Sequence, residues 1–186
     1  MQVGGDASSK EGWRIAASLI YGLTGDREKA AEIINKLELC TEQEAKVQFT
    51  MADRKINTVL STSAGRLFDG VSAILGIRRK STFEGEASMA LEFAAEEYIE
   101  RRQTEISEDE KSLWNDMQAE MEETECHEIF ADKEKSMTDR LLLNTESLVK
   151  TILDRCLNGE KPGRLAYFFH QELAYQIIDA CVQIRQ

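Results

Sequence analysis

The chain has 186 residues, of which 42% are hydrophobic and 31% are charged, so it fits one folded domain and not a disordered segment. Its 23 basic and 34 acidic residues give a net charge of −11. This charge disfavours a general nucleic-acid binder or a protein that binds anionic membranes, because both need positive surface. A single proline lets long helices run without interruption, and we expect one mainly α-helical region over residues 1–186.

The first third of the chain carries the start signals of three helices. A Ser8-x-x-Glu11 capping box precedes a first helix that should end near Gly22–Gly25. Asp26 opens a second helix, and a Thr41-x-x-Glu44 box opens a third. Apolar residues recur at helical spacing through these helices: Trp13, Ala16, Ala17, Ile20, Tyr21, Ala30, Ile33, Ile34, Leu37, Ala45, Val47, Phe49 and Ala52.

The segment Ser61–Gly76 predicts a hydroxyl-rich loop that leads into a short helix. Gly76 stands where a helix C-terminal glycine belongs. Arg66 and Asp69 share the polar face, and Gly70 would let a ligand approach the backbone beside the carboxylate. The pair could equally be an ordinary solvated ion pair on a helix surface. The residues expected to face the core are Leu67, Phe68, Val71, Ile74 and Leu75.

The second half of the chain predicts four more helices and a small β-hairpin. A long helix runs from about Glu84 through Arg101, and a Ser107-x-x-Glu110 box starts another. Helical periodicity fails from Cys126 to Leu143, which favours a hairpin around residues 127–143. Two further helices are expected at Thr145–Leu157 and, after Pro162, at Gly163–Ile184.

We interpret the cysteines, His170 and the acidic run 120–125 as residues without a chemical role. The four cysteines, Cys40, Cys126, Cys156 and Cys181, form no Cys-x-x-Cys pair, and we interpret them as reduced thiols. His170 stands among aromatic residues and is expected in the core. The acidic run 120–125 is assigned no function. No segment approaches a membrane-spanning apolar run, and the N-terminus lacks a basic region followed by an apolar core, so we expect a cytoplasmic protein.

The run Thr62–Gly76 resembles the signature of the HypF family, carbamoyltransferases that mature nickel–iron hydrogenases. Three further segments resemble that family in the same order: Gly4-Gly5-Asp6 with Trp13-Arg14, then Phe83–Glu92, then Phe169–Ala174. One departure is Gly12, where the family usually has proline before the Trp-Arg pair. That change touches no chemistry in the sequence pattern and affects only the preference for a helix start.

The resemblance implies an actin- or hexokinase-like catalytic domain, shared with the universal tRNA threonylcarbamoyladenosine synthesis protein. Such domains place a His-x-x-x-His metal motif before the glycine pair and a metal-binding aspartate far downstream. The two histidines of this chain, His127 and His170, do not form that motif. We therefore expect a helical fragment of the domain, inactive by itself, with the divalent metal bound by residues outside this chain.

The resemblance also implies an activity and candidate site residues. The family uses carbamoyl phosphate and ATP to make carbamoyl-adenylate, and passes the carbamoyl group to the C-terminal cysteine of its partner HypE. By resemblance to the related tRNA-modifying proteins, Asp69 would hold the nucleotide ribose and Gly85 would touch the nucleotide. The pair Gly4-Gly5 would contact the transferred group, although a glycine pair alone is usually a turn. Ser63 and Arg66 join the candidate binding residues by proximity.

Two other functions stay open from the sequence. One is a stand-alone helical binding module that kept the fold without the chemistry. The other is an O-carbamoyltransferase of antibiotic biosynthesis, which shares the domain. In a fragment without its partner lobe, the surface that would face that lobe should be apolar and could support self-association.

Overall fold

The computed structural model describes residues 2–3, 5–105 and 143–185, and in these ranges the chain is mainly α-helical, as predicted. The hairpin predicted around residues 127–143 and the helix predicted from Ser107 lie outside the described residues, except for the last position of the hairpin. In chain order the elements are β1 (Gln2–Val3), the 3-10 helix η1 (Gly5–Ser9), α1 (Gly12–Thr24), α2 (Arg27–Lys36), α3 (Glu42–Asp53), β2 (Thr58–Val59), α4 (Ala64–Ile74), α5 (Glu86–Glu105), α7 (Thr145–Leu157) and α8 (Pro162–Arg185).

Most of the predicted helix boundaries rest on local capping that the structure confirms. The Asp26 carboxylate accepts hydrogen bonds from the first-turn amides of α2. Thr41 and Glu44 form both halves of the capping box that opens α3. At the end of α4, Gly76 has a left-handed φ of 71°, and the next amide, that of Ile77, bonds back to the Ser72 carbonyl at 3.0 Å. This C-terminal motif ends the helix where the sequence predicted.

The capping box predicted at Ser8 is wrong. The residue that precedes α1 is Glu11, and its side chain makes no capping hydrogen bond. Ser8 lies one element earlier, in η1, where its hydroxyl donates to the Gly5 carbonyl at 2.6 Å. The Glu11 carboxylate instead pairs with Arg14 and Lys80, so a charge partner from a distant loop replaces the expected local cap.

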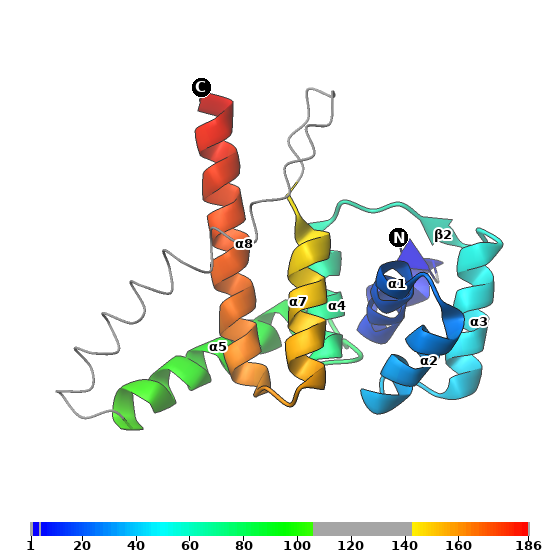
Figure 1. Cartoon of the computed structure of the whole chain (residues 1–186), viewed down its shortest axis with the longest axis horizontal. Helices are drawn as coiled ribbons and strands as arrows, with labels where there is room; N and C mark the ends of the chain where they lie inside the picture. The colour runs from blue at the N-terminus through cyan, green and yellow to red at the C-terminus, as the bar shows by residue number, and fades with distance from the viewer. Residues whose placement is uncertain (1, 4, 106–142, 186) are drawn as a thin grey trace.

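The helices form one continuous core that joins the two ends of the chain. In Figure 1, α1–α3 lie on one side, α5 and α8 on the other, and α4 and α7 between them. The most extensive packing is between α1 and α4 and between α5 and α8. The largest fully buried side chains come from both sides of the fold: Trp13, Phe169, Ile20, Ile34, Ile74, Leu91, Leu148, Ile152, Leu165, Gln48 and Val71.

Gly70 permits the close crossing of α1 and α4. A Cβ atom placed there would lie 2.8 Å from Leu19 Cδ1 and 3.1 Å from Ile15 Cγ2. A larger residue there would force the Leu19 and Ile15 side chains of α1 to shift. The role of Gly70 is therefore to bring α1 against α4, since its α-carbon faces that helix.

A short antiparallel pairing of β1 with β2 was not predicted. Gln2 pairs with Val59 and Val3 with Thr58. Two-residue strands are too short to show an alternating pattern, so periodicity gave no signal for them. The pairing matters for the site because it brings the start of η1 beside the segment that leads into α4.

The last turns of α8 extend beyond the start of α7 (Figure 1). Four large apolar side chains there are exposed: Ile177, Ile178, Val182 and Ile184. Self-association through such a surface stays a prediction. Among the described residues, no helix is both long and apolar enough to cross a lipid bilayer.

Candidate functional site

The candidate site is built on the first two turns of α4. Arg66 Nη1 donates to Asp69 Oδ2 at 2.8 Å, and also to the Ser9 carbonyl of η1 at 3.3 Å. The i,i+3 spacing makes the first bond possible on any helix, whereas the second requires η1 to be folded against α4. Arg66 thus links the candidate carboxylate to the element that follows the glycine pair.

Asp69 lies in a drier setting than an ordinary surface residue. Its side chain is 16% exposed and that of Arg66 is 30% exposed. Burial raises the pKa of Asp69 above its ordinary value, and the nearby Arg66 guanidinium offsets this only in part. The sequence allowed an ordinary solvated ion pair of Arg66 and Asp69. The structure contains this ion pair, but both side chains are partly buried. A carboxylate that is kept ionised against such a shift is a candidate for binding or chemistry.

Two more candidate residues lie around this pair, and a third cannot be placed. Gly5 begins η1 with a φ of 55°, and a Cβ atom there would be 4.0 Å from Asn57, the residue before β2. Ser63 is the residue before α4; its hydroxyl makes no cap bond, and it is exposed. Gly4 lies outside the described residues. Ser63, Gly5 and the Arg66–Asp69 pair thus come from neighbouring elements, η1 and the start of α4.

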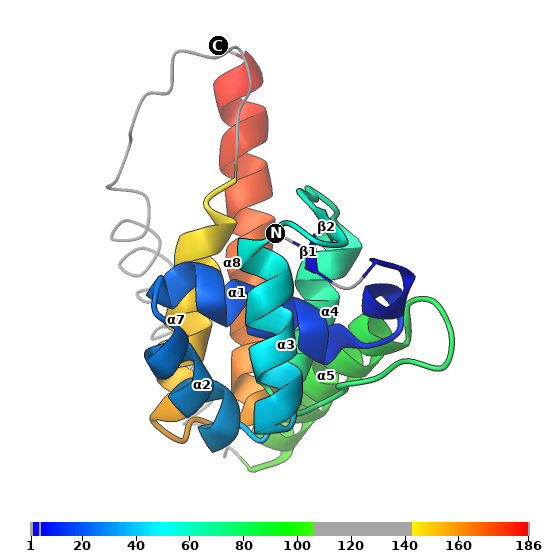
Figure 2. The same cartoon turned by 90° about the vertical axis from the view of Figure 1, so that its right-hand side faces the viewer.

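Gly85 stands at the start of α5, at the end of the loop that leaves α4. Its φ of 83° is a left-handed conformation that favours glycine. Beyond it, the Glu86 carboxylate accepts from the Thr82 hydroxyl at 3.0 Å and pairs with Arg78 at 3.1 Å. Figure 2 shows the loop 76–85 and η1 on the same side of α4. The loop that ends at Gly85 thus lies on the same side of α4 as η1.

The residues interpreted as structural keep that interpretation where the structure describes them. His170 Nδ1 lies 2.7 Å from the Ala166 carbonyl of its own helix, and its ring contacts those of Phe68 and Phe169 edge-on. Burial raises the pKa of the Cys40 thiol to about 11 and also raises the pKa of Cys156, so neither is an activated thiolate at neutral pH. Cys126 lies outside the described residues. Within the described ranges no three His, Cys, Asp or Glu side chains gather as a metal-binding group.

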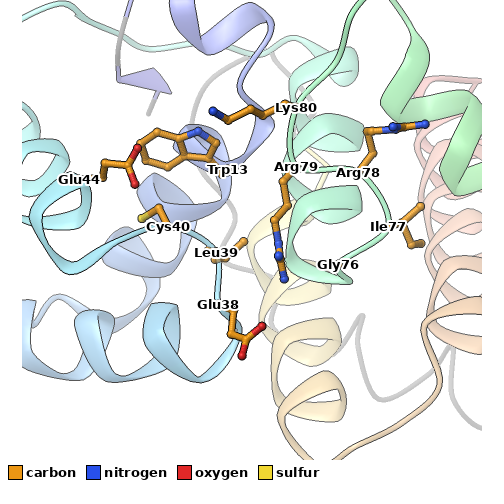
Figure 3. A pocket seen from close by; sticks show the side chains of 10 residues that line it. All are labelled: Trp13, Glu38, Leu39, Cys40, Glu44, Gly76, Ile77, Arg78, Arg79 and Lys80. Carbon is orange, nitrogen blue, oxygen red and sulfur yellow. The ribbon is translucent and has the colours of Figure 1, made fainter.

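Sequence reasoning missed a cleft of about 430 Å³ between the start of α1, the α2–α3 connection and the loop after α4 (Figure 3). Trp13, Leu39 and Cys40 line it, and Arg79 and Lys80 approach it from the loop. The three consecutive cations at positions 78–80 were the sequence signal that could have drawn attention to this loop. Two of those cations are already paired, Arg78 with Glu86 and Lys80 with Glu11.

The chain is similar to known proteins along its whole length. The whole chain, residues 1–186, matches the family described as carbamoyltransferase, Kae1-like domain, second subdomain. A probable carbamoyltransferase HypF of Methanocaldococcus jannaschii is 27% identical over 183 residues, which are 98% of this chain and 20% of that protein. A carbamoyltransferase HypF homolog of Cupriavidus necator is 34% identical over 97 residues, 52% of this chain and 24% of that protein.

A solved structure shares the fold. The crystal structure of full-length HypF in its phosphate- and nucleotide-bound form matches with a TM-score of 0.66 and 22% sequence identity, over 99% of this chain and 20% of that one. The chain thus spans between a fifth and a quarter of the length of these proteins.

Proposed function

The chain belongs to the HypF carbamoyltransferase family, as the second subdomain of the Kae1-like domain, and we propose that it forms one wall of an adenylate-binding site. In the whole protein, carbamoyl phosphate and ATP would give carbamoyl-adenylate, and the carbamoyl group would pass to the C-terminal cysteine of a HypE-like acceptor in the cytoplasm. Divalent metal would be held by residues outside this chain. This chain would contribute to nucleotide binding and to placing the transferred group.

The observation that carries the proposal is the half-buried Arg66–Asp69 pair bonded to η1. Arg66 occupies Oδ2 of the carboxylate, so Oδ1 can accept a hydroxyl hydrogen of the ligand. Hydrogen bonds to an ionised carboxylate are stronger than those between neutral groups, and two ribose hydroxyls suit such an acceptor. Burial disfavours the charged form of Asp69 and raises its pKa. Hydrogen bonds from a bound ribose would favour the charged form and so offset this effect.

The other candidate residues extend the wall on either side of this carboxylate. Gly85, in its left-handed conformation, would let the nucleotide approach the backbone at the start of α5. Gly5 would take the transferred carbamoyl group together with Gly4. Ser63, exposed and without a capping bond, would offer a hydroxyl to the same ligand.

The test is calorimetric titration of the chain with AMP, which contains the ribose and the adenine of the adenylate. Asp69→Asn keeps the size of the side chain and removes its charge, so AMP affinity should fall by about 1.5–3 kcal/mol, the range for a hydrogen bond to a charged group. Asp53→Asn is the matched control, because Asp53 also pairs with an arginine, Arg27, but lies at the end of α3. The Asp53→Asn variant should bind AMP with the same affinity as the unaltered chain.

The proposal has two ways to fail. If the unaltered chain binds no AMP at millimolar concentration, this wall does not bind nucleotide. If Asp69→Asn and Asp53→Asn change the affinity equally, Asp69 is an ordinary ion-pair partner and the ribose contact is wrong.

A further inference from the structure

The start of α1 and the loop after α4 meet residue by residue in antiparallel order. The Ser81 amide donates to the Lys10 carbonyl at 2.7 Å. Lys80 Nζ lies 3.3 Å from Glu11 Oε1. The Trp13 amide then donates to the Arg79 carbonyl at 3.1 Å. We call these contacts between residues 10–13 and 79–81 the clasp.

Gly12 places the clasp directly against the candidate site. A Cβ atom at Gly12 would lie 2.9 Å from the Asp69 carbonyl oxygen and 3.7 Å from the Arg79 carbonyl oxygen. The first of these atoms is backbone on α4 and the second is backbone in the loop, so neither can turn away as a side chain would. A side chain at position 12 would therefore press on the α4 backbone at Asp69 and come into contact with the loop at Arg79.

The same loop is anchored a second time through the Arg79 side chain. Arg79 Nη2 donates to the Leu37 carbonyl at 2.9 Å, at the C-terminal end of α2. Arg79 therefore accepts from the first turn of α1 with its backbone and caps the end of α2 with its guanidinium. Figure 3 shows this side chain extending from the loop toward Leu39 and Glu38, in the connection that follows α2. The loop is thus held by α1 and α2 in addition to its bonds to α4 and α5, the two helices that it connects.

We propose that the clasp is a positioning device that fixes where the loop 76–85, and with it Gly85, stands relative to Asp69, and that Gly12 and Glu11 are positioning residues for nucleotide binding. This inference rests on the proposed function, because Asp69 and Gly85 are the nucleotide contacts that it aligns. Trp13 and Arg14 also support the clasp. Arg14 lies over the Trp13 ring at 4.4 Å and bonds to Glu11, so it holds the carboxylate that receives Lys80.

Gly12→Ala tests the device, with Gly22→Ala as its control on the same helix. A Cβ atom at Gly22 meets no atom within 4 Å, so that change should alter nothing in the loop. In Gly12→Ala, hydrogen–deuterium exchange should become faster at the amides of Trp13 and Ser81, while α7 keeps its protection. Unchanged exchange at Trp13 and Ser81 in a folded Gly12→Ala chain would overturn the proposal.

Calorimetric titration with AMP separates positioning from simple structural support. Gly12→Ala should bind AMP about tenfold more weakly, since a small misplacement of binding groups has effects of this order or larger, while Gly22→Ala binds normally. Faster exchange with unchanged AMP affinity would overturn the positioning role. If Gly12→Ala does not fold, Glu11→Gln serves instead: it removes the charge that attracts Lys80 without adding bulk, and the same two measurements apply.

These outcomes stay distinct from failure of the proposed function. If the unaltered chain binds AMP and Asp69→Asn weakens it while the clasp variants do not, the nucleotide wall stands and the positioning role falls. If the unaltered chain binds no AMP, the proposed function falls, and the positioning of Gly85 for nucleotide falls with it.

Discussion

In the part of the chain that the structure describes, two arginine–aspartate pairs differ in almost everything except their chemistry. Arg66–Asp69 lies on the first turns of α4, and the Asp69 side chain is 16% exposed. Arg27–Asp53 joins the start of α2 to the end of α3, and the Asp53 side chain is 39% exposed. The pKa of Asp69 is raised because burial outweighs Arg66, whereas hydrogen bonds from Arg27 and Tyr21 lower the pKa of Asp53.

The difference shows that burial, and not the presence of a cation, decides what a carboxylate contributes. In the exposed pair the arginine simply favours the charged form, and the pair supports folding. In the half-buried pair, folding places a charge where water solvates it poorly, and the arginine compensates only part of that loss. The second arrangement reduces stability locally and leaves a carboxylate that a ligand can satisfy.

The two pairs also differ in the packing of the residues around them. Phe68, beside Asp69, packs edge-on against the fully buried Phe169, with ring centroids 4.9 Å apart. Asp53 instead accepts from the Tyr21 hydroxyl at 2.7 Å, at the surface. If the Asp69 region is the rigid one, changes beneath it should have the larger effects, and the following predictions test this in order of expected size.

The largest effect should come from Phe169→Ala. This change removes a fully buried ring under α4, and the free energy of unfolding should fall by about 3–5 kcal/mol. Phe93→Ala is the control, because that ring on α5 is 57% exposed, and it should change stability little. Urea denaturation followed by circular dichroism measures both. Equal small losses would mean that the Asp69 region does not rest on a rigid core.

An intermediate effect is expected from Gly70→Ala. The added methyl group would meet Leu19 and Ile15 at 2.8 and 3.1 Å, and overpacking of this kind costs about 1–3 kcal/mol. Gly65→Ala, on the same helix, places its methyl group only against the Ser63 hydroxyl at 3.7 Å and should be neutral or slightly stabilising. Thermal melts of both variants make the comparison. A stable Gly70→Ala chain would show that α1 and α4 can separate without loss.

The smallest effect, but the one with opposite signs, concerns pH. The folded state raises the pKa of Asp69, so ionisation lowers stability, and the unaltered chain should gain stability relative to Asp69→Asn as the pH falls through that raised pKa. At neutral pH, Asp69→Asn should be neutral or stabilising by no more than about 1 kcal/mol. The pKa of Asp53 is lowered, so its contribution is present above the unfolded pKa and is lost as the pH falls through the folded value.

Melting curves of the unaltered chain, Asp69→Asn and Asp53→Asn between neutral and acidic pH measure these differences. The two difference curves should slope in opposite directions. Parallel curves would mean that the two carboxylates have the same environment, and the contrast between buried and exposed pairs would be wrong.

The sequence also predicted part of the candidate site. It placed Arg66 and Asp69 on one face of one helix, because their spacing of three residues fixes that relation. It could not predict the bond from Arg66 to Ser9, the pairing of β1 with β2, or the contact of Gly12 with Asp69. Each of these joins segments far apart in the chain, and no local pattern encodes such a meeting. The prediction at Ser8 failed because the Glu11 carboxylate pairs with Arg14 and with the distant Lys80, while the Ser8 hydroxyl bonds to Gly5.

The sequence by itself determined where most of the described helices begin and end, because those signals act within about four residues. The helix predicted at Thr145–Leu157 has those bounds in the structure, with Asn144 capping its start. Tertiary structure alone decided how deeply the Asp69 side chain is buried, where the loop 76–85 lies relative to α4 and which contacts hold that loop. Burial and alignment depend on how whole helices pack, and here two glycines, Gly12 and Gly70, set how closely α1 approaches α4.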